Sequence, residues 1–185
     1  MIVNNGGRVE NIKSQIGQDF FVLHSLYWKK NGFFVEFGAT NGFDLSNTYL
    51  LEKDFGWRRI LAEPAKIWHE DLGTNRSTSI DHDCVWSESG KVIDFIVTSE
   101  AEYSTASCFT HQDAHAASRN KASTFSVNTV SLVDLLKRHN APPKIDYLSI
   151  DTEGSELHIL EAFDFDEYAI SVITCEHNFS SQRIK

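Results

Sequence analysis

The chain of 185 residues has few cysteines, no concentration of positive charge and no long apolar run. Its three cysteines, Cys84, Cys108 and Cys175, are far apart and form no C-x-x-C pair, which favours reduced thiols and a cytoplasmic location. No apolar stretch approaches the roughly 20 residues that cross a bilayer, so no membrane span is expected. The first 13 residues are polar and lack the apolar centre of a signal peptide.

The charge balance of the chain is acidic. Aspartate and glutamate number 26 against 17 lysines and arginines, which gives a net charge of −9 at pH 7. No run of lysine and arginine is interleaved with aromatic residues, as a phosphate-binding surface requires, so nucleic acid is not an expected partner. The length and a hydrophobic fraction of 41% predict a single globular domain over residues 1–185.

Predicted strands and helices alternate along most of the chain. An N-terminal helical segment is expected within residues 1–32, with its helix at 18–30. Short apolar runs bounded by turn residues predict strands at Phe33–Phe37, Arg59–Ala62, Ser79–Val85, Ile145–Ile150 and Ile170–Cys175. Amphipathic segments predict helices near 46–55, 66–72, 132–139 and 154–163, the third capped by Ser131. This order predicts an α/β, Rossmann-like fold, with a mostly parallel sheet and helices on both faces.

Two stretches depart from that alternation. Lys91–Thr98 alternates in polarity and is expected to form an antiparallel strand, and Val127–Val130 a short strand. Residues 100–126 are rich in serine, threonine, alanine and histidine, without a sustained apolar period. This composition predicts a long flexible loop over the substrate site.

The most informative stretch runs from Phe33 to Gly42. An apolar run ends in the acid Glu36, and the chain then turns through Gly38 and Gly42 before a helix begins. Glycines allow a backbone to approach a ligand closely, and helix N-termini favour polar or anionic groups. Open α/β sheets bind their ligands at the carboxyl ends of the strands. The stretch therefore predicts a site for a nucleotide-like cofactor.

Acids also close the following strands. Glu63 and Asp151 each end a predicted strand, and Glu176-His177-Asn178 follows the last one, so all are expected to line one edge of the sheet. A glycine loop with an acid at the end of the next strand is typical of a ribose-bearing cofactor, whose hydroxyls the acid binds. Glu63 is that acid. The alternative is an ordinary strand–turn–helix with solvated acids.

The loop lacks the G-x-G-x-x-G pattern of dinucleotide-binding proteins. Thr40 occupies the place of the second glycine, and Asp44 adds a negative charge. Both disfavour a pyrophosphate and hence NAD. A cofactor without phosphates, S-adenosylmethionine, fits better: Glu36 is expected near its amino-acid moiety and Glu63 at its ribose.

Several short motifs carry a resemblance to a known family. They are Phe34–Gly42, Ser46–Thr48 with Leu51–Lys53, Gly56-Trp57, Ala62–Pro64, Val85–Ser87 with Gly90, Val130–Leu136, Ile145–Glu156 and Glu176–Asn178. Together the chain resembles the FkbM-type S-adenosylmethionine-dependent methyltransferases over roughly residues 14–178. The resemblance implies a class I methyltransferase fold and methyl transfer to a hydroxyl of a sugar, a glycan or a similar small molecule. Many relatives carry asparagine where this chain has Thr40, and Asn41 follows it.

The resemblance also implies which residues contact the cofactor. Glu36, Gly38, Ala39 and Gly42 would surround the methionine part, and Glu63 would hold the ribose. The residues near the adenine would be Asp83, Cys84 and Val85. Further expected contacts come from Gln15, Gln18, Asn41, Pro64 and Asp151.

Asp151, Glu153 and His177 are the candidate catalytic residues. Methyl transfer to oxygen requires a nucleophile held in line with the methyl group and a base that takes its proton. Asp151 and Glu153 are expected to bind or deprotonate the acceptor hydroxyl, and His177, with an ordinary pKa of about 6.5, is the alternative base. The structural alternatives are charge stabilisation of a helix start for Glu153 and Glu156, and an ordinary hydrogen bond for His177.

The sequence offers two sets of possible metal ligands. Asp151, Glu176 and Asn178 supply oxygen ligands that suit Mg²⁺, although their spacing does not require a metal. His111 and His115 stand four residues apart, but no third zinc ligand is evident, so a solvated loop is expected there.

Two other functions compete with methyl transfer. The chain ends soon after Ile170–Cys175, whereas methyltransferases of this fold usually add two more strands. That shortness favours a catalytically idle ligand-binding domain, and it leaves the last strand as an exposed edge or as a site of homo-oligomer pairing. The acids Asp151 and Glu153 argue against a domain without catalytic activity. A nucleotide-dependent oxidoreductase is the third possibility, disfavoured by Thr40 and Asp44.

Overall fold

The computed structural model describes residues 11–77, 79–97, 123–152 and 154–176. It also gives the backbone of three two-residue strands, β1 (Ile2–Val3), β2 (Gly7–Arg8) and β8 (Thr105–Ala106). Strands β1 and β2 pair with each other in antiparallel fashion. No helix in the described ranges is long and apolar enough to cross a membrane.

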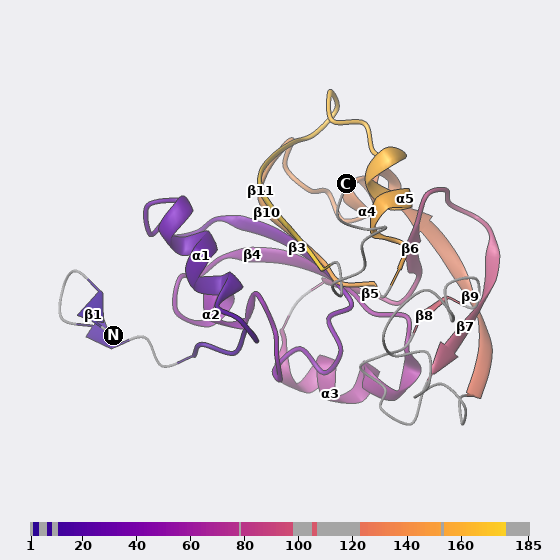
Figure 1. Cartoon of the computed structure of the whole chain (residues 1–185), viewed down its shortest axis with the longest axis horizontal. Helices are drawn as coiled ribbons and strands as arrows, with labels where there is room; N and C mark the ends of the chain where they lie inside the picture. The colour runs from indigo at the N-terminus through magenta and orange to yellow at the C-terminus, as the bar shows by residue number, and fades with distance from the viewer. Residues whose placement is uncertain are drawn as a thin grey trace.

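Within the described part of the chain, five parallel strands form the central sheet in the order β11-β10-β3-β4-β5 (Figure 1). Their bounds are β3 Phe33–Phe37, β4 Arg58–Ala62, β5 Ser79–Asp81, β10 Lys144–Ile150 and β11 Ala169–Cys175. The chain runs outward from β3 through β4 to β5 and then returns to β10 on the other side of β3. The strand order therefore reverses between β3 and β10, where open α/β sheets bind ligands.

Helices cover both faces of this sheet. One face carries α1 (Gln18–Ser25), α2 (Tyr49–Lys53) and α3 (His69–Asn75), and the other carries α4 (Leu132–Arg138) and α5 (Glu156–Glu161). The 3-10 turn η1 (Lys66–Trp68) precedes α3, and its Trp68 packs against the core of the second sheet. Strand β3 is buried on both sides and is therefore mostly apolar: Phe33, Val35 and Phe37 join the core beneath α4 and α5, and Phe34 joins the core beneath α1 to α3. The predicted parallel sheet with helices on both faces is confirmed.

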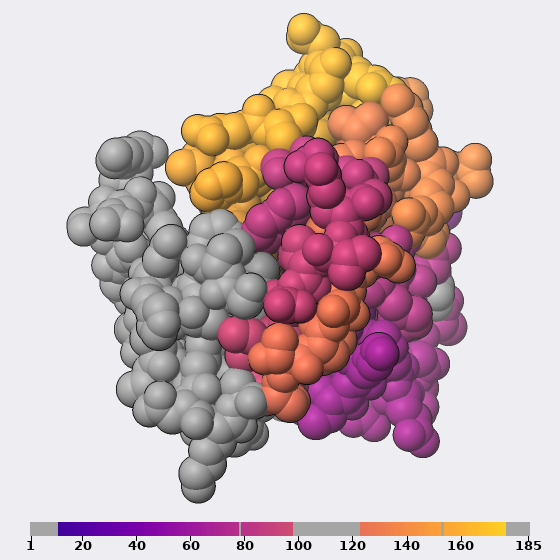
Figure 2. Space-filling model, turned by 90° about the vertical axis from the view of Figure 1, so that its right-hand side faces the viewer, coloured from indigo at the N-terminus to yellow at the C-terminus, as the bar shows by residue number. Residues whose placement is uncertain are grey.

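A second sheet lies beside the first. It contains β6 (Cys84–Trp86), β7 (Val92–Val97), β8 and β9 (Ser123–Ser131) in the order β6-β9-β7-β8. Strand β6 runs parallel to β9, and β7 runs antiparallel to both β9 and β8. Figure 2 shows β7 and β9 side by side on one face of the molecule. The antiparallel strand predicted over Lys91–Thr98 is thus confirmed.

The prediction of one strand over Ser79–Val85 is wrong. The chain leaves the central sheet after Asp81 and enters the second sheet at Cys84. The Asp81 carboxylate accepts hydrogen bonds from the backbone N–H of Asp83 at 3.0 Å and from Arg138 at 2.8 Å, and these fix a turn between the two strands. Apolar residues stand on both sides of the turn, at Ile80 and at Cys84-Val85, and the polar residues between them mark the break.

The prediction of one loop over residues 100–126 is wrong for two segments, which form strands. Ser123–Ser126 belongs to β9 and pairs with β7, and Thr105–Ala106 forms β8. The polar residues of β9 alternate with Phe125 and Val127, which pack in a small core with Phe95. Because alternate residues of β9 are polar and exposed to solvent, its sequence resembles that of a loop. The other residues of 100–122 lie outside the described ranges, so their predicted loop over the substrate stays a prediction.

Strand β11 lies at the edge of the central sheet. Among the described residues its partner is β10, and alternate residues from Ala169 to Cys175 are exposed. Pairing of this edge with a second copy of the chain stays a prediction, as does a single domain over residues 1–185. The predicted cap of α4 is confirmed: the Ser131 side chain accepts a hydrogen bond from the backbone N–H of Asp134.

Candidate functional site

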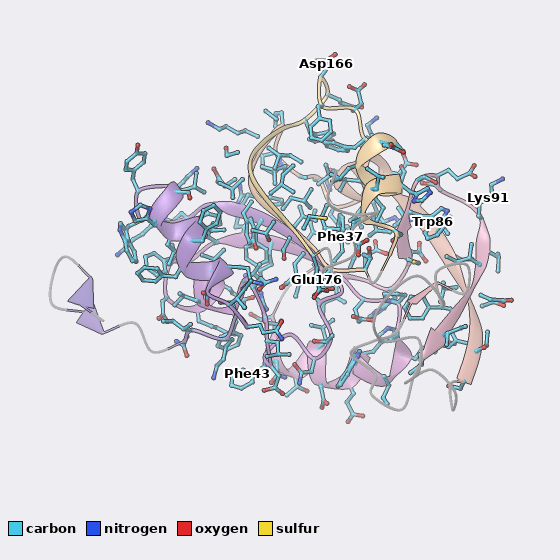
Figure 3. All side chains as sticks on the ribbon, in the orientation of Figure 1. Phe37, Phe43, Trp86, Lys91, Asp166 and Glu176 are labelled. Carbon is cyan, nitrogen blue, oxygen red and sulfur yellow. The ribbon has the colours of Figure 1, made fainter. Side chains whose placement is uncertain are left out.

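The carboxyl ends of the central strands bring three of the predicted site residues together. Gly38 follows β3, Glu63 follows β4 and Asp151 follows β10. A Cβ atom added to Gly38 would lie 1.9 Å from the backbone oxygen of Asp151, so these two segments touch directly. Figure 3 shows Phe37, the last residue of β3, and Glu176, which follows β11, at this same edge.

The loop after β3 depends on backbone conformations that favour glycine. Gly38 and Gly42 have φ values of 69° and 72°, and Thr40 between them has a φ of 47°. A β-branched residue in this left-handed region is strained, and such strain persists where the surroundings fix the backbone. Here the Thr40 N–H donates to Glu63 Oε2 at 2.8 Å. The strained turn is therefore tied to the end of the neighbouring strand.

Glu63 joins three segments at the site. Its Oε2 accepts from the backbone N–H of Thr40, and its Oε1 accepts from the backbone N–H of Ala65 at 2.8 Å. The backbone N–H of Glu63 itself donates to the backbone oxygen of Asp81. The side chain is buried, and burial raises the pKa of Glu63 to about 7, with the two backbone donors opposing the rise. A carboxylate offers about four acceptor positions, and the described residues fill two of them.

Replacing Glu63 by glutamine is expected to flatten the pH dependence of stability. The folded-state pKa of about 7 exceeds the ordinary 4.5, so the folded protein binds more protons between these values and stability falls as pH rises. The wild type should therefore lose roughly 2–3 kcal/mol more than Glu63→Gln between pH 5 and pH 8, as measured by urea unfolding. Glu88→Gln, which changes an exposed carboxylate, is the control and should keep the wild-type decline. Equal declines in wild type and Glu63→Gln would contradict the assignment.

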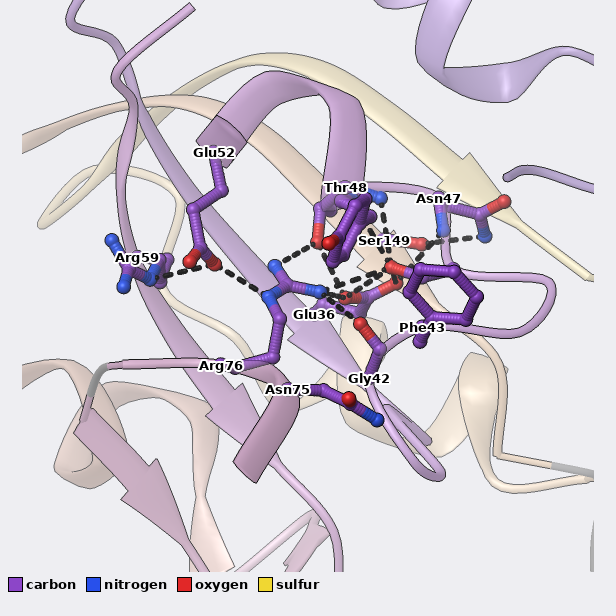
Figure 4. A network of polar contacts seen from close by, with 12 residues as sticks. Glu36, Gly42, Phe43, Asn47, Thr48, Glu52, Arg59, Asn75, Arg76 and Ser149 are labelled. Carbon is purple, nitrogen blue, oxygen red and sulfur yellow. Dashed lines mark hydrogen bonds and ion pairs between the residues drawn. The ribbon is translucent and has the colours of Figure 1, made fainter. Parts of the chain in front are cut away.

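Glu36 lies one residue before the end of β3 and points into the face covered by α2 and α3, where it is 3% exposed. Its predicted contact with the cofactor stays a prediction. Its carboxylate accepts hydrogen bonds from Thr48 Oγ1 at 2.6 Å and from the Asn47 N–H at 3.1 Å (Figure 4). Burial raises the pKa of the Glu36 carboxyl, and the charge of Arg76 opposes this.

Arg76 is the central residue of that buried network, and the sequence analysis missed it. Its guanidinium is fully buried, 2.5 Å from Glu52 and 3.9 Å from Glu36. It also donates to the Gly42 backbone oxygen at 2.9 Å and to Thr48 Oγ1 at 2.9 Å (Figure 4). Arg76 thus binds the glycine loop to the helices beneath it. One signal was available: an acid inside an apolar buried strand requires a cation.

The residues predicted near the adenine divide between two environments. Asp83 is paired with Arg138 at 2.8 Å, while Cys84 and Val85 are buried in β6. An imidazole pair that the sequence did not indicate lies close by. His69 and His82 stack with ring centroids 3.7 Å apart, and His69 Nε2 lies 3.0 Å from the Glu63 backbone oxygen.

Other predicted cofactor contacts have local partners. Asn41 Oδ1 accepts from the N–H groups of Phe43 and Asp44, which closes the turn after Gly38. Gln18 Oε1 accepts from the Ile16 N–H at the start of α1. Ala39 is buried and Pro64 half-buried at the strand ends. These contacts shape the loops, and the predicted cofactor contacts of the same residues stay predictions.

Several candidates lie outside the described residues: Cys108, His111, His115, Glu153, His177 and Asn178. Asp151 is half-buried at the end of β10, and Glu176 continues the sheet by donating its N–H to the Ile150 oxygen at 3.0 Å. Glu156 opens α5 and accepts hydrogen bonds from the N–H groups of Thr152 and Gly154 in the turn before that helix. Across the ranges that the structure describes, no three histidine, cysteine or acidic side chains gather as metal ligands do.

A comparison with protein families decides the relationship of this chain. The family described as "Methyltransferase FkbM domain" matches residues 36–185, from the end of β3 onward. The chain belongs to the FkbM methyltransferase family. The resemblance predicted from the motifs is thereby confirmed, and the parallel sheet with its reversal between β3 and β10 agrees with the Rossmann-like fold expected of it.

The FkbM match includes the features built up above: Glu36, the glycine loop, Glu63 and Asp151 all lie within the matched range. No curated protein and no solved structure gave a significant match to the chain.

Proposed function

We propose that this FkbM-family protein is an S-adenosylmethionine-dependent O-methyltransferase that acts on a hydroxyl of a sugar, a glycan or a similar small molecule. The observation that carries the proposal is Glu63, a buried carboxylate at the end of β4, two of whose acceptor positions face no protein donor in the hydrogen bonds described above. It stands beside the glycine loop at the reversal of the strand order. This is where a ribose would offer two hydroxyl donors.

The residues at the sheet edge fit such a cofactor. Glu63 would hold the ribose, the Gly38–Ala39 turn and Asp151 would lie along the methionine part, and Asp83, Cys84 and Val85 would lie toward the adenine. The strained Thr40 and the acids around it fit a cofactor without phosphates better than a pyrophosphate. When bound, the cofactor supplies a methyl group activated by its sulfonium.

The protein's own part in the reaction is to hold and deprotonate the acceptor. Asp151, half-buried at the end of β10, is proposed to bind the acceptor hydroxyl and to accept its proton. Glu153 and His177 keep their proposed roles as further base candidates. A Mg²⁺ held by Asp151, Glu176 and Asn178 would be a third way to position the hydroxyl.

Calorimetric titration of the purified chain with S-adenosylmethionine, S-adenosylhomocysteine and NAD tests the proposal. We expect micromolar binding of the first two, and Glu63→Ala should abolish it because the ribose loses its acceptor. Binding of NAD alone would instead support an oxidoreductase. No binding by a folded protein would refute the cofactor assignment.

The binding measurement is repeated at pH 6 and pH 8 to test the role of the Glu63 charge. If the ribose requires ionised Glu63, binding should weaken about 10-fold from pH 8 to pH 6, because the pKa of Glu63 is about 7. Glu88→Gln should bind as wild type at both values. The titration is then repeated with added EDTA or Mg²⁺, and turnover is measured with hydroxylated acceptors. The two measurements together test whether the proposed Mg²⁺ is required.

A further inference from the structure

Asn47 is held firmly at the reversal between β3 and β10. Its backbone N–H donates to Glu36 Oε1 at 3.1 Å, and its side-chain Nδ2 donates to Ser149 Oγ at 3.0 Å. Glu36 and Ser149 are themselves buried and face each other across the two strands. Two anchors on a rigid sheet fix both the backbone and the carboxamide of Asn47.

The carboxamide oxygen of Asn47 is left without a donor. Its Oδ1 is buried, and none of the described residues donates a hydrogen bond to it. Figure 4 shows this oxygen turned away from Ser149 and from the network around Arg76. Buried acceptors are nearly always paired, and an unpaired one is costly. An acceptor that is fixed, buried and unpaired indicates a donor that arrives with a ligand.

The position of Asn47 selects which donor this is. Ser149 lies in β10, two strands from β4, where Glu63 follows, and two strand spacings amount to about 10 Å. S-adenosylmethionine carries donors at its adenine amine, its two ribose hydroxyls and its ammonium. The first two groups belong to the adenosine end, on the side of Glu63. The ammonium is the donor at the other end of the cofactor.

We infer that Asn47 Oδ1 accepts a hydrogen bond from the ammonium of the cofactor's amino-acid end, with Ser149 and Glu36 as the positioning residues. The inference rests on the proposed function and deepens it. One of the two Nδ2 hydrogens is used by Ser149, and Oδ1 is the unpaired acceptor that the carboxamide leaves for a ligand. An oxygen acceptor attracts an ammonium and repels a carboxylate. Glu36, predicted to contact the amino-acid moiety, acts on it through Asn47.

Two ligands that differ at one end provide the test. S-adenosylhomocysteine has the amino-acid end, and 5′-methylthioadenosine has the same adenosine without it. In titration calorimetry of the full chain, Asn47→Ala should weaken S-adenosylhomocysteine at least about 10-fold and change 5′-methylthioadenosine less than about 2-fold. The analogue of S-adenosylhomocysteine that lacks only the amino group should bind wild type and Asn47→Ala equally.

Three further variants separate positioning from general damage. Ser149→Ala should weaken S-adenosylhomocysteine selectively, because the carboxamide loses its anchor. Asn47→Asp keeps an oxygen acceptor at this place, and the Ser149 hydroxyl can donate to its other oxygen in place of the lost Nδ2 bond. It should therefore bind S-adenosylhomocysteine within a few fold of wild type, which also covers the case in which Asn47→Ala does not fold. Asn75→Ala removes a loop asparagine bonded to the Asn41 oxygen and should affect both ligands equally.

The outcomes distinguish this inference from the proposed function. Equal weakening of both ligands by Asn47→Ala, or no weakening of S-adenosylhomocysteine, overturns the role of Asn47 and leaves the cofactor intact. A wild type that binds neither ligand overturns both.

Discussion

Arg76→Met is expected to destabilise the protein by about 3–5 kcal/mol, because it removes one member of a buried ionic network. The guanidinium is fully buried and stands between Glu52 and Glu36, so its loss leaves two carboxylates without their buried cation. It also removes the donors to Gly42 and Thr48 that hold the glycine loop. Equilibrium urea unfolding measures the change in free energy.

Arg59→Met is the matched control for Arg76. Arg59 binds the same Glu52 at 2.9 Å, but its side chain is 14% exposed and lies at the edge of the network. We expect it to cost about 1 kcal/mol. Adding Glu36→Gln to Arg76→Met should recover a large part of the loss, because Glu52 keeps its ion pair with Arg59 and the other buried carboxylate is neutralised. Similar costs for the two arginine variants would show that the network does not depend on Arg76.

Gly38→Ala is expected to destabilise the protein by at least about 3 kcal/mol and to abolish cofactor binding. The new Cβ would meet the Asp151 backbone oxygen at 1.9 Å, and the φ of 69° is unfavourable for alanine. Because backbone atoms form the obstacle, the loop after β3 must separate from the end of β10. Thermal unfolding and titration with S-adenosylhomocysteine measure the two effects.

Gly90→Ala separates the two causes of that loss. Gly90 has a similar φ of 79°, yet nothing lies within 4 Å of its added Cβ. It should therefore cost only the strain of a left-handed alanine, about 1–2 kcal/mol, and leave binding unchanged. If Gly38→Ala proves no worse than Gly90→Ala, close contact between the two strand ends is not needed.

Local patterns were enough to locate most of the central sheet. The run Phe33–Phe37 was found with its observed bounds, because a strand buried on both faces reads as continuous apolar sequence. The helix at Leu132–Arg138 was found through its Ser131 cap and the spacing of its leucines. Glu63 was placed correctly at the end of its strand, because the residue after a strand is set by the strand itself.

The second sheet and the buried arginine required contacts between distant residues. The pairing of β9 with β7 could not be read from Ser123–Ser126, whose polar side chains gave no apolar period. Arg76 is separated by 40 positions from Glu36, and an arginine beside a predicted strand carries no local mark of burial. Its role depends on which helix packs over β3.

By itself, the sequence determined the order of strands and helices, the glycine turn, the acids that close the strands and membership of the FkbM methyltransferase family, because each depends on neighbouring residues or on short motifs. Only the tertiary structure decided that Glu36 turns into a buried network, that Gly38 touches Asp151 and that Asn47 presents an unpaired oxygen. The reason is physical: burial, charge pairing and unpaired acceptors are properties of residues brought together across strands.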